Sequence, residues 1–508
     1  MERISRGPGA LTAQRLLGIR RGIEKESLRA LPTGALAMTP HPRALGSALT
    51  HPNITTDFSE SQVELITGVH KDVEACLAEL QDVQQATFAE LGDELLWVSS
   101  MPCGLPADDA IPLGQYGSSN VGQSKTVYRR GLGHRYGRRM QTISGIHYNW
   151  SLPDVASEDY FGLIRNFRRH AFLLLYLFGA SPAVCSTFVA GRQHQLQALN
   201  AHTMYLPYAT SLRMGRLGYQ SDAQASLAVS YNSLEGYAYS LHGALTTAYP
   251  AYQAIGVQAA NGQYLQLGTS LLQIENEFYG TIRPKRVIFP GERPLHALRE
   301  RGVEYVEVRL MDLDPFEPLG IHVQTMRFLD VFLLHCLQTD SPPDTPEEIV
   351  ALSHNQQAVA ERGRQPGLLL ERGDAQIPLK DWGHTILQEM RPLAQQLDMA
   401  HGGTLYQQAL DAAVQGLDQP HTLPSARVLD VMQKDFNGSF IAFGHAQSER
   451  LKHDTLATPL AADKAARFKA LGEASWADQQ KIEAADTMPF DIYLKTYLDP
   501  KRLVAKAL

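Results

Sequence analysis

Carboxylates spaced two residues apart are the features of this sequence with the clearest chemical potential. In residues 22–29 (GIEKESLR), Glu24 and Glu26 flank a single lysine. Because residues i and i+2 of a β-strand point to the same face, these two carboxylates would project together. The same spacing occurs in four more segments, whose polar sides are Glu60, Gln62 and Glu64 in residues 60–67, His147 and Asn149 in residues 144–151, Tyr305, Glu307 and Arg309 in residues 304–312, and Glu275, Glu277 and Tyr279 in residues 272–279.

Metal binding is the chemistry that such strand faces favour. For any one segment alone, the favoured explanation is an antiparallel sheet with one solvated face. A solvated face is a weaker explanation for five segments that are all rich in acids and poor in lysine, because crowded carboxylates repel one another unless cations neutralise them. Oxygen ligands suit Mg²⁺ or Mn²⁺, and the histidine favours tolerance of Mn²⁺. Carboxylate-bound metal ions beside Arg309 would suit phosphoryl transfer.

The familiar nucleotide-binding motifs are incomplete. Residues 117–126 (GSSNVGQSKT) resemble a phosphate-binding loop, but Gln123 and Ser124 separate Gly122 from Lys125. The glycines at 131, 133 and 137 miss the dinucleotide-binding spacing by one residue. If ATP binds to this protein, the predicted sheet and its metal ions must hold it.

Composition indicates a globular protein. The chain has 508 residues, of which 44% are hydrophobic and 19% are charged. Its 46 basic and 53 acidic side chains give a formal net charge of −7, which disfavours nucleic acid as a partner. No signal peptide is apparent, and the most apolar run, residues 171–178, is far shorter than the ~20 residues of a membrane-spanning helix. We therefore expect a cytoplasmic protein with no membrane partner.

The cysteines are few and scattered. Cys76, Cys103, Cys185 and Cys336 form no C-x-x-C pair, which predicts neither a disulfide framework nor a zinc–thiolate site and favours a reducing compartment. Packing is the expected role of Cys103 and Cys185. The sequence does not decide whether any of the four cysteines has a redox role.

The predicted elements divide the chain into two regions. Apolar residues recur with helical spacing in residues 71–95 and 158–178, whereas strand-like alternation is concentrated in residues 20–325. Beyond these the pattern becomes helical, with loops at 341–343 and 364–367. We expect an α/β (α+β) fold in which residues 1–325 form a catalytic antiparallel-sheet body with inserted helices. Residues 326–508 would form a mainly helical region packed on that body, within the same catalytic unit.

Eight segments, in unbroken order over roughly residues 18–325, resemble the proteobacterial type of the glutamate–cysteine ligase family. They are RRGIEKESLR, HPRALGSALTHPNITTDFSESQVELIT, LWVSSMPC, QYGSSNVGQSKTVYRRGL, RYGRRMQTISGIHYNWS, YATSLRMGRLGYQ, LQIENEFYGTIRPKR and GVEYVEVRLMDLDPFEPLGI. The match is patchy after residue 325. The resemblance implies a funnel-like antiparallel sheet similar to the glutamine synthetase core, with metal ligands that project inward.

The resemblance also implies a reaction. ATP-dependent ligation of the γ-carboxyl of L-glutamate to the amino group of L-cysteine, through γ-glutamyl phosphate, gives γ-glutamylcysteine, ADP and phosphate. This is the first step of glutathione biosynthesis. Mg²⁺, for which Mn²⁺ can substitute, is the implied cofactor, ATP is the co-substrate, and glutathione is an implied feedback inhibitor. The alternative is a related ligase that joins glutamate to a different amine.

Matching positions give the site residues that the resemblance implies. The implied ligands of the divalent cations are Glu24, Glu26, Asp57, Glu64, His147 and Glu307. The implied catalytic residues, which hold the transferring phosphoryl group, are Arg213 and Arg309. The implied cysteine-binding residues are Tyr128, Leu132, Gln141, Tyr219 and Tyr279. Nucleotide phosphates are a weaker assignment for the basic stretch Arg283, Lys285 and Arg286, which is at least as compatible with a solvated turn.

Structural roles remain as alternatives for part of this set. Tyr219 and Tyr279 would fit as half-buried core tyrosines, and Leu132 as plain packing. His147 would fit as a hydrogen-bonded core histidine. Glu60 and Glu277 share strand parity with the expected ligands, but we expect them beside the cluster or in solvent.

Overall fold

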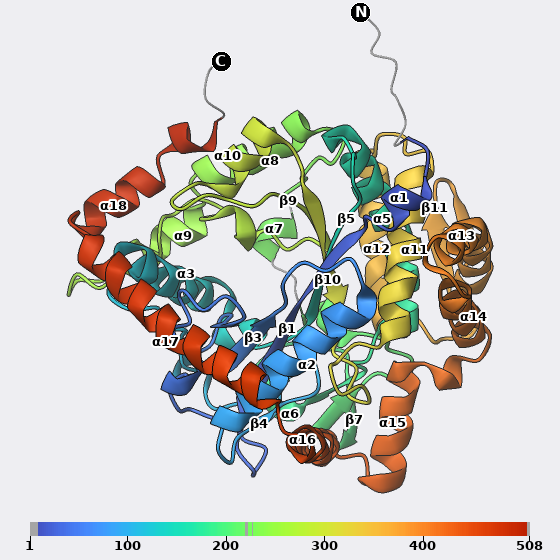
Figure 1. The fold of residues 1–508 in the computed structure, drawn as a ribbon, viewed down its shortest axis with the longest axis horizontal. Helices are drawn as coiled ribbons and strands as arrows, with labels where there is room; N and C mark the ends of the chain where they lie inside the picture. The colour runs from blue at the N-terminus through green and yellow to red at the C-terminus, as the bar shows by residue number, and fades with distance from the viewer. Residues whose placement is uncertain (1–8, 219–221, 226, 505–508) are drawn as a thin grey trace, which may run out of the picture.

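An antiparallel sheet forms the centre of the computed structural model, which describes residues 9–218, 222–225 and 227–504. Six strands follow the order β2–β3–β1–β5–β10–β9, and β4 pairs with the end of β1. The strands are β1 (Arg20–Ala30), β2 (Ile54–Thr56), β3 (Gln62–Ile66), β4 (Leu95–Leu96), β5 (Ile146–Ser151), β9 (Ile282–Lys285) and β10 (Tyr305–Met311). Figure 1 shows β1, β3, β5, β9 and β10 in the central part of the molecule, with helices around them.

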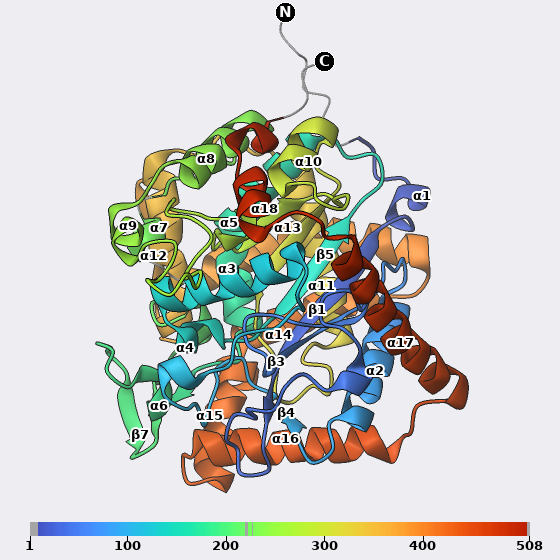
Figure 2. The ribbon, with the colours of Figure 1, turned by 90° about the vertical axis from the view of Figure 1, so that its left-hand side faces the viewer.

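The helices that surround the sheet come from both halves of the chain. They are α2 (Val73–Glu90), α3 (Asn120–Tyr136), α5 (Ser157–Phe178), α11 (Val323–Gln338), α12 (Pro346–Arg362), α13 (Leu379–His401), α14 (Leu405–Asp418), α17 (Ala462–Ala485) and α18 (Phe490–Tyr497). Helices α13 and α14 pack on α11, and α12 packs on α5. Helix α17 lies against α2, and α18 lies against α3, as Figure 2 shows. The end of the chain therefore returns to elements from its beginning.

One face of the sheet is apolar and buried. Tyr148 and Trp150 of β5, and Val306 and Val308 of β10, each have 0% exposure. These side chains share one hydrophobic core with α5 and α11. Because side chains alternate along a strand, burial of this face directs the intervening polar side chains to the other side. A slip of one residue would reverse the two faces, so the core fixes the register of the polar residues.

Most predicted elements are confirmed. The expected helices over residues 71–95 and 158–178 are α2 and α5, and four of the five predicted polar strands are β1, β3, β5 and β10. The region after residue 325 is mainly helical, although it also contains a short hairpin of β11 (Leu369–Arg372) and β12 (Ala375–Pro378). None of the helices within the described ranges combines the length and apolar character needed to cross a lipid bilayer.

The fifth predicted strand, residues 272–279, is wrong. Residues Glu275–Glu277 form a 3₁₀ turn, and the two glutamates lie in separate ion pairs. Glu275 accepts from Arg293 Nη2 at 2.8 Å, and Glu277 accepts from Arg135 Nη2 at 2.8 Å. Alternating polarity here results from two buried carboxylates that each meet an arginine from elsewhere in the chain.

The expectation of no disulfide is also wrong for two cysteines. Cys103 and Cys185 form a disulfide across 82 residues of sequence, with their Cα atoms 5.3 Å apart. Strand β6 (Ala183–Cys185) places Cys185 beside the segment that follows β4 and contains Cys103. No local sequence pattern predicts that these two cysteines lie close together. Cys76 and Cys336 are free and buried. The cysteine pattern therefore no longer supports a reducing compartment.

A buried ion pair links the sheet to the helical layer. The guanidinium of Arg21 on β1 lies 2.8 Å from the carboxylate of Asp330 on α11, and both side chains have 0% exposure. The hydroxyl of Tyr148 on β5 donates to the same carboxylate at 2.9 Å. Removing one member of a buried pair leaves the other charge without compensation, which is far more costly than losing an exposed pair.

Asp330→Ala should therefore lower the free energy of unfolding by about 3–5 kcal/mol, because the Arg21 guanidinium loses its buried carboxylate. Urea denaturation followed by circular dichroism measures the change. The matched control is Asp430→Ala, which removes an exposed carboxylate paired with Lys434 and should hardly move the midpoint. A similarly small change for Asp330→Ala would contradict the anchoring role of this pair.

Candidate active site

The polar face of the sheet gathers the six predicted metal ligands. Strand register places Glu24 of β1 opposite His147 of β5, and Glu26 of β1 opposite Glu64 of β3. Glu307 comes from β10, on the other side of β5. A cavity of about 300 Å³ is lined by five of the six, namely Glu24, Asp57, Glu64, His147 and Glu307. The sixth, Glu26, is 1% exposed and lies beside His147, which lines the cavity.

His147 lies at the centre of the acidic cluster, the name used here for these six residues. Its Nδ1 atom is 3.1 Å from Glu24 Oε2 and 3.5 Å from Glu307 Oε1. Its Nε2 atom is 3.5 Å from Glu26 Oε1. Glu24, Glu64 and His147 each present a ligand atom within 4.8 Å of the others. Carboxylates from three strands thus converge on one imidazole.

Basic side chains border the cluster on the β10 and β9 side. Arg309 Nη1 lies 2.6 Å from Glu307 Oε1, and Lys285 Nζ lies 3.2 Å from Glu307 Oε2. Although burial alone would raise it, the pKa of Glu307 is held well below its usual value by Lys285 and Arg309. Glu307 is therefore a fixed anion between cations.

The carboxylates farther from these cations are poorly compensated. Burial, followed by repulsion from Asp57, raises the pKa of Glu26 to about 8. Burial and the neighbouring carboxylates Glu24 and Asp57 raise the pKa of Glu64 well above its usual value. Burial is the largest influence on Glu24 and would raise its pKa, but the hydrogen bond with His147 and the charges of His147 and Lys285 together lower it. The protein alone thus favours the protonated forms of Glu26 and Glu64, and a bound cation would stabilise their ionised forms.

The donor set fits hard divalent cations. It comprises five carboxylates and one imidazole, and Mg²⁺ and Mn²⁺ prefer oxygen donors of this kind. The Nε2 atom of His147 is buried and has no hydrogen-bond partner within the described ranges. A buried polar atom without a partner is costly, so a ligand at this position would remove the cost. These residues would therefore suit a pair or cluster of divalent ions.

Arg213 lies behind the cluster and is held there by glycine and carboxylate contacts. Its Nη2 donates to the backbone oxygen of Arg309 at 2.8 Å, and its Nη1 is 3.9 Å from Asp312. A Cβ atom on Gly145 would lie only 2.2 Å from Arg213 Nη2, so this close approach requires glycine. Asp312 is fixed in turn by the hydroxyls of Ser181 and Ser211, at 2.6 and 2.9 Å.

A second cavity, of about 380 Å³, adjoins the first. Arg309 and Tyr279 line both cavities, and Arg213 lines the second. Arg309 therefore stands between two compartments. A side chain in this position could contact a chemical group while that group passes from a substrate in one cavity to a substrate in the other.

Four of the five predicted cysteine-binding residues lie together. Tyr128 and Leu132 of α3, Gln141 of α4 (Arg138–Gln141) and Tyr279 line the cavity of the acidic cluster. Gln141 Nε2 donates to the Tyr279 hydroxyl at 2.8 Å. The fifth, Tyr219, lies outside the described residues.

The three residues of the basic stretch, Arg283, Lys285 and Arg286, do not all lie in the cavity. Arg283 and Lys285 of β9 line the same cavity, whereas Arg286 lies apart, beside Glu304 and the backbone oxygen of Arg301. Glu60, which shares strand parity with the ligands, accepts from the backbone N–H groups of His41 and Gln115.

Several cavity residues were missed from the sequence. Lys125 and Arg129 lie on the same side of α3 as Tyr128 and Leu132, at helical spacings of three and four residues that could have revealed them. Burial, followed by repulsion from Arg129, lowers the pKa of Lys125 to about 8. Tyr497 of α18 also lines the cavity, but nothing local in the sequence links it to the sheet.

Comparisons with known proteins agree with this architecture. A family model described as glutamate-cysteine ligase matches residues 10–359. A glutamate–cysteine ligase of Alcanivorax borkumensis is 47% identical over 507 residues, which covers 96% of each chain. One from Saccharophagus degradans is 48% identical over 505 residues and covers 95% of this chain and 94% of its own. A crystal structure of the Francisella tularensis enzyme in complex with AMP has a TM-score of 0.91 at 37% identity and covers 95% of this chain and 98% of its own.

The raised pKa values of Glu26 and Glu64 predict a pH-dependent response to Mg²⁺. A carboxyl group whose pKa is raised in the folded state favours folding below its unfolded pKa of about 4.5, and this contribution is lost as the pH rises through about 8 for Glu26. The metal-free protein should therefore lose stability between about pH 5 and pH 8, and Mg²⁺ should raise the unfolding temperature more at the higher pH.

Thermal unfolding at both pH values, with and without Mg²⁺, measures this difference. Glu26→Gln serves as the control, because its amide cannot titrate, and it should show a smaller loss on raising the pH. Equal stabilisation by Mg²⁺ at both pH values would show that the buried carboxylates do not bind the ion.

Proposed function

This chain belongs to the glutamate–cysteine ligase family, and we propose that the acidic cluster and its two arginines carry out the reaction of that family. The enzyme joins the γ-carboxyl of L-glutamate to the amino group of L-cysteine and converts ATP to ADP and phosphate. The observation that carries the assignment of the site is the convergence of carboxylates, histidine and arginine from β1, β3, β5 and β10 on one cavity. AMP in the Francisella tularensis structure supports an adenine nucleotide as co-substrate.

The chemistry explains why the site needs both cations and arginines. A carboxylate is a poor acyl donor, so ATP first converts the γ-carboxyl of glutamate into an acyl phosphate. This transfer concentrates negative charge on the phosphoryl oxygens. Arg309, between the two cavities, would donate hydrogen bonds to those oxygens, and Arg213 would support it from behind.

The residues of the acidic cluster would hold the divalent cations. When bound, Mg²⁺, or Mn²⁺ in its place, would supply positive charge that stabilises the negative charge of the phosphate groups. Glu307 would stay ionised because of Lys285 and Arg309, whereas Glu26 and Glu64 would lose their protons on ion binding. His147 would complete the set through its unpartnered Nε2.

The other wall of the cavity would bind cysteine. Tyr128, Leu132, Gln141 and Tyr279 combine apolar surface for a small side chain with polar groups for its ends. Tyr219 is included on the resemblance of its segment alone. After binding, the neutral amine would attack the acyl carbon, so that the C–N bond forms, the C–O bond to phosphate breaks and one N–H proton is released to solvent. The wall residues would keep out water that would otherwise hydrolyse the acyl phosphate.

Three wider proposals follow from this site. Tyr497 of α18 lines the cavity, which supports residues 1–325 and 326–508 as one catalytic unit. Glutathione carries the γ-glutamylcysteine unit, so it would compete for the same cavity and act as a feedback inhibitor. A cytoplasmic location would give the enzyme its ATP and free cysteine.

The assay that tests the function measures phosphate release from ATP in the presence of glutamate, with and without cysteine. Release should require both amino acids, and γ-glutamylcysteine should appear in equal amount. Other amines at the same concentration serve as controls. Release with another amine but not with cysteine would support the related ligase instead, and no release with any amine would refute an enzymatic role.

Arg309→Ala should lower kcat by about 10²–10³-fold while leaving the fold intact, because it removes a donor to the charge that develops on the phosphoryl group. Arg286→Ala is the matched control, since this nearby arginine lies outside the cavity and should keep wild-type turnover. Steady-state rates and circular dichroism test both variants. Unchanged turnover in Arg309→Ala would remove this residue from the catalytic set.

A further inference from the structure

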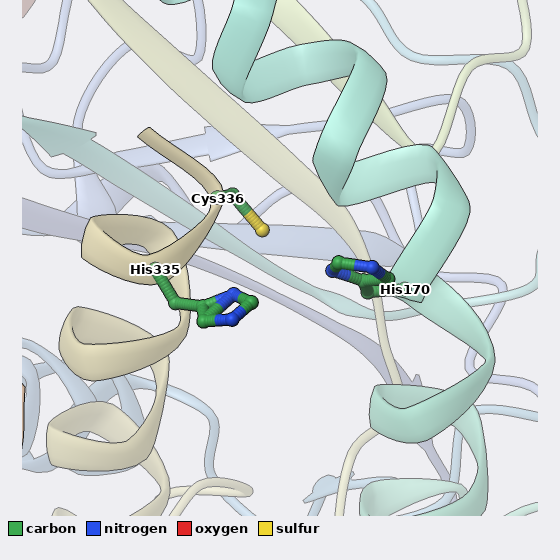
Figure 3. Close-up of side chains that lie close together, drawn as sticks. All are labelled: His170, His335 and Cys336. Carbon is green, nitrogen blue, oxygen red and sulfur yellow. The ribbon is translucent and has the colours of Figure 1, made fainter. Parts of the chain in front are cut away.

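A second group of metal-binding side chains lies between α5 and α11, outside both cavities. His170 comes from α5, and His335 and Cys336 are neighbours on α11. Their nitrogen and sulfur atoms lie within 4.8 Å of one another. Figure 3 shows the Cys336 thiol and the His335 ring directed from one helix toward the His170 ring on the other.

The two imidazoles have ring nitrogens without partners. The Nδ1 atoms of His170 and His335 are both buried, and neither has a hydrogen-bond partner among the residues that the structure describes. His335 is 3% exposed and Cys336 is 0% exposed. A buried polar atom without a hydrogen-bond partner costs folding free energy. A ligand bound by these two nitrogens and the buried thiol would remove that cost.

A carboxylate orients one of these rings from outside. Glu389 of α13 lies 3.0 Å from His335 Nε2, and its side chain is 54% exposed. A proton on Nε2 would be shared with this carboxylate, which leaves the lone pair of Nδ1 directed to the space between the helices. Carboxylate–histidine pairs of this kind are the usual support of a metal-binding imidazole.

We propose that His170, His335 and Cys336 form a site for a single zinc-type divalent ion, separate from the Mg²⁺ site. Two imidazoles and one thiolate form a donor set that a borderline-soft ion prefers, whereas Mg²⁺ prefers oxygen. Water would occupy the fourth position, and the half-buried His170 gives the ion a route from the surface. Zinc would link α5 to α11 directly.

Ligation requires small movements and the loss of one proton. In a tetrahedral site with bonds of about 2.0–2.3 Å, the donor atoms lie roughly 3.5 Å apart, so the three side chains would close by about 1 Å. The Cys336 thiol would release its proton to solvent as the zinc–sulfur bond forms. Burial lowers the pKa of His170 to about 3 and that of His335 to about 4, so both rings are neutral and available to a metal ion at neutral pH.

Cobalt absorption tests the site, because Co²⁺ replaces zinc and a thiolate ligand gives a charge-transfer band that oxygen ligands lack. The full-length chain is titrated with Co²⁺ in excess Mg²⁺, which occupies the acidic cluster. One equivalent should produce the thiolate band and intense visible bands typical of tetrahedral Co²⁺. Cys336→Ser should abolish the thiolate band, and Zn²⁺ should compete with Co²⁺ at least about tenfold less well for this variant than for wild type.

Two further variants serve as a control for cysteine replacement and as a test of the supporting carboxylate. Cys76→Ser replaces the other free, buried cysteine and should keep the full band. Glu389→Gln changes only a half-exposed side chain and should weaken Co²⁺ binding about 10–100-fold without loss of fold. A folded wild-type protein without the thiolate band, or a band that survives in Cys336→Ser, would overturn the proposal.

Discussion

Repulsion between buried carboxylates constrains everything else in this protein. Glu26 and Glu64 face each other across neighbouring strands, and the rest of the acidic cluster surrounds them. Burial and repulsion from neighbouring carboxylates raise the pKa values of both groups, so the protein alone favours their protonated forms, whereas Lys285 and Arg309 keep Glu307 ionised. One part of the site therefore needs a bound cation for its carboxyl groups to ionise. The other part already has the positive side chains of Lys285 and Arg309. That division suits an enzyme that brings cations and ATP phosphates together.

The remainder of the fold holds this unfavourable arrangement in place. The apolar face of β5 and β10 packs into the main core, and the Arg21–Asp330 pair ties β1 to α11. Together they prevent the strands from sliding, which would be the simplest way for the carboxylates to separate. The Arg309 backbone and Gly145 position Arg213 behind the cluster. Packing elsewhere in the fold therefore holds the crowded carboxylates together.

The sequence predicts the polar strands well because alternation along a strand is a local property. Four segments follow that rule, and their registers bring Glu24, Glu26, Glu64, His147 and Glu307 together. Residues 272–279 have the same alternation, but their two carboxylates form ion pairs with Arg135 and Arg293. Sequence spacing carries no information about such distant partners. The Cys103–Cys185 disulfide and the approach of Tyr497 were unpredictable for the same reason, since each depends on long-range packing. Lys125 and Arg129 were predictable from the helical face they share with Tyr128 and Leu132.

Anomalous diffraction from crystals grown with Mn²⁺ and a non-hydrolysable ATP analogue tests the central claim most directly. The account predicts anomalous peaks within about 2.0–2.3 Å of carboxylate oxygens of the acidic cluster, with at least one ion also bound to a phosphate oxygen. Ordered nucleotide with no Mn²⁺ among Glu24, Glu26, Glu64, His147 and Glu307 would contradict it.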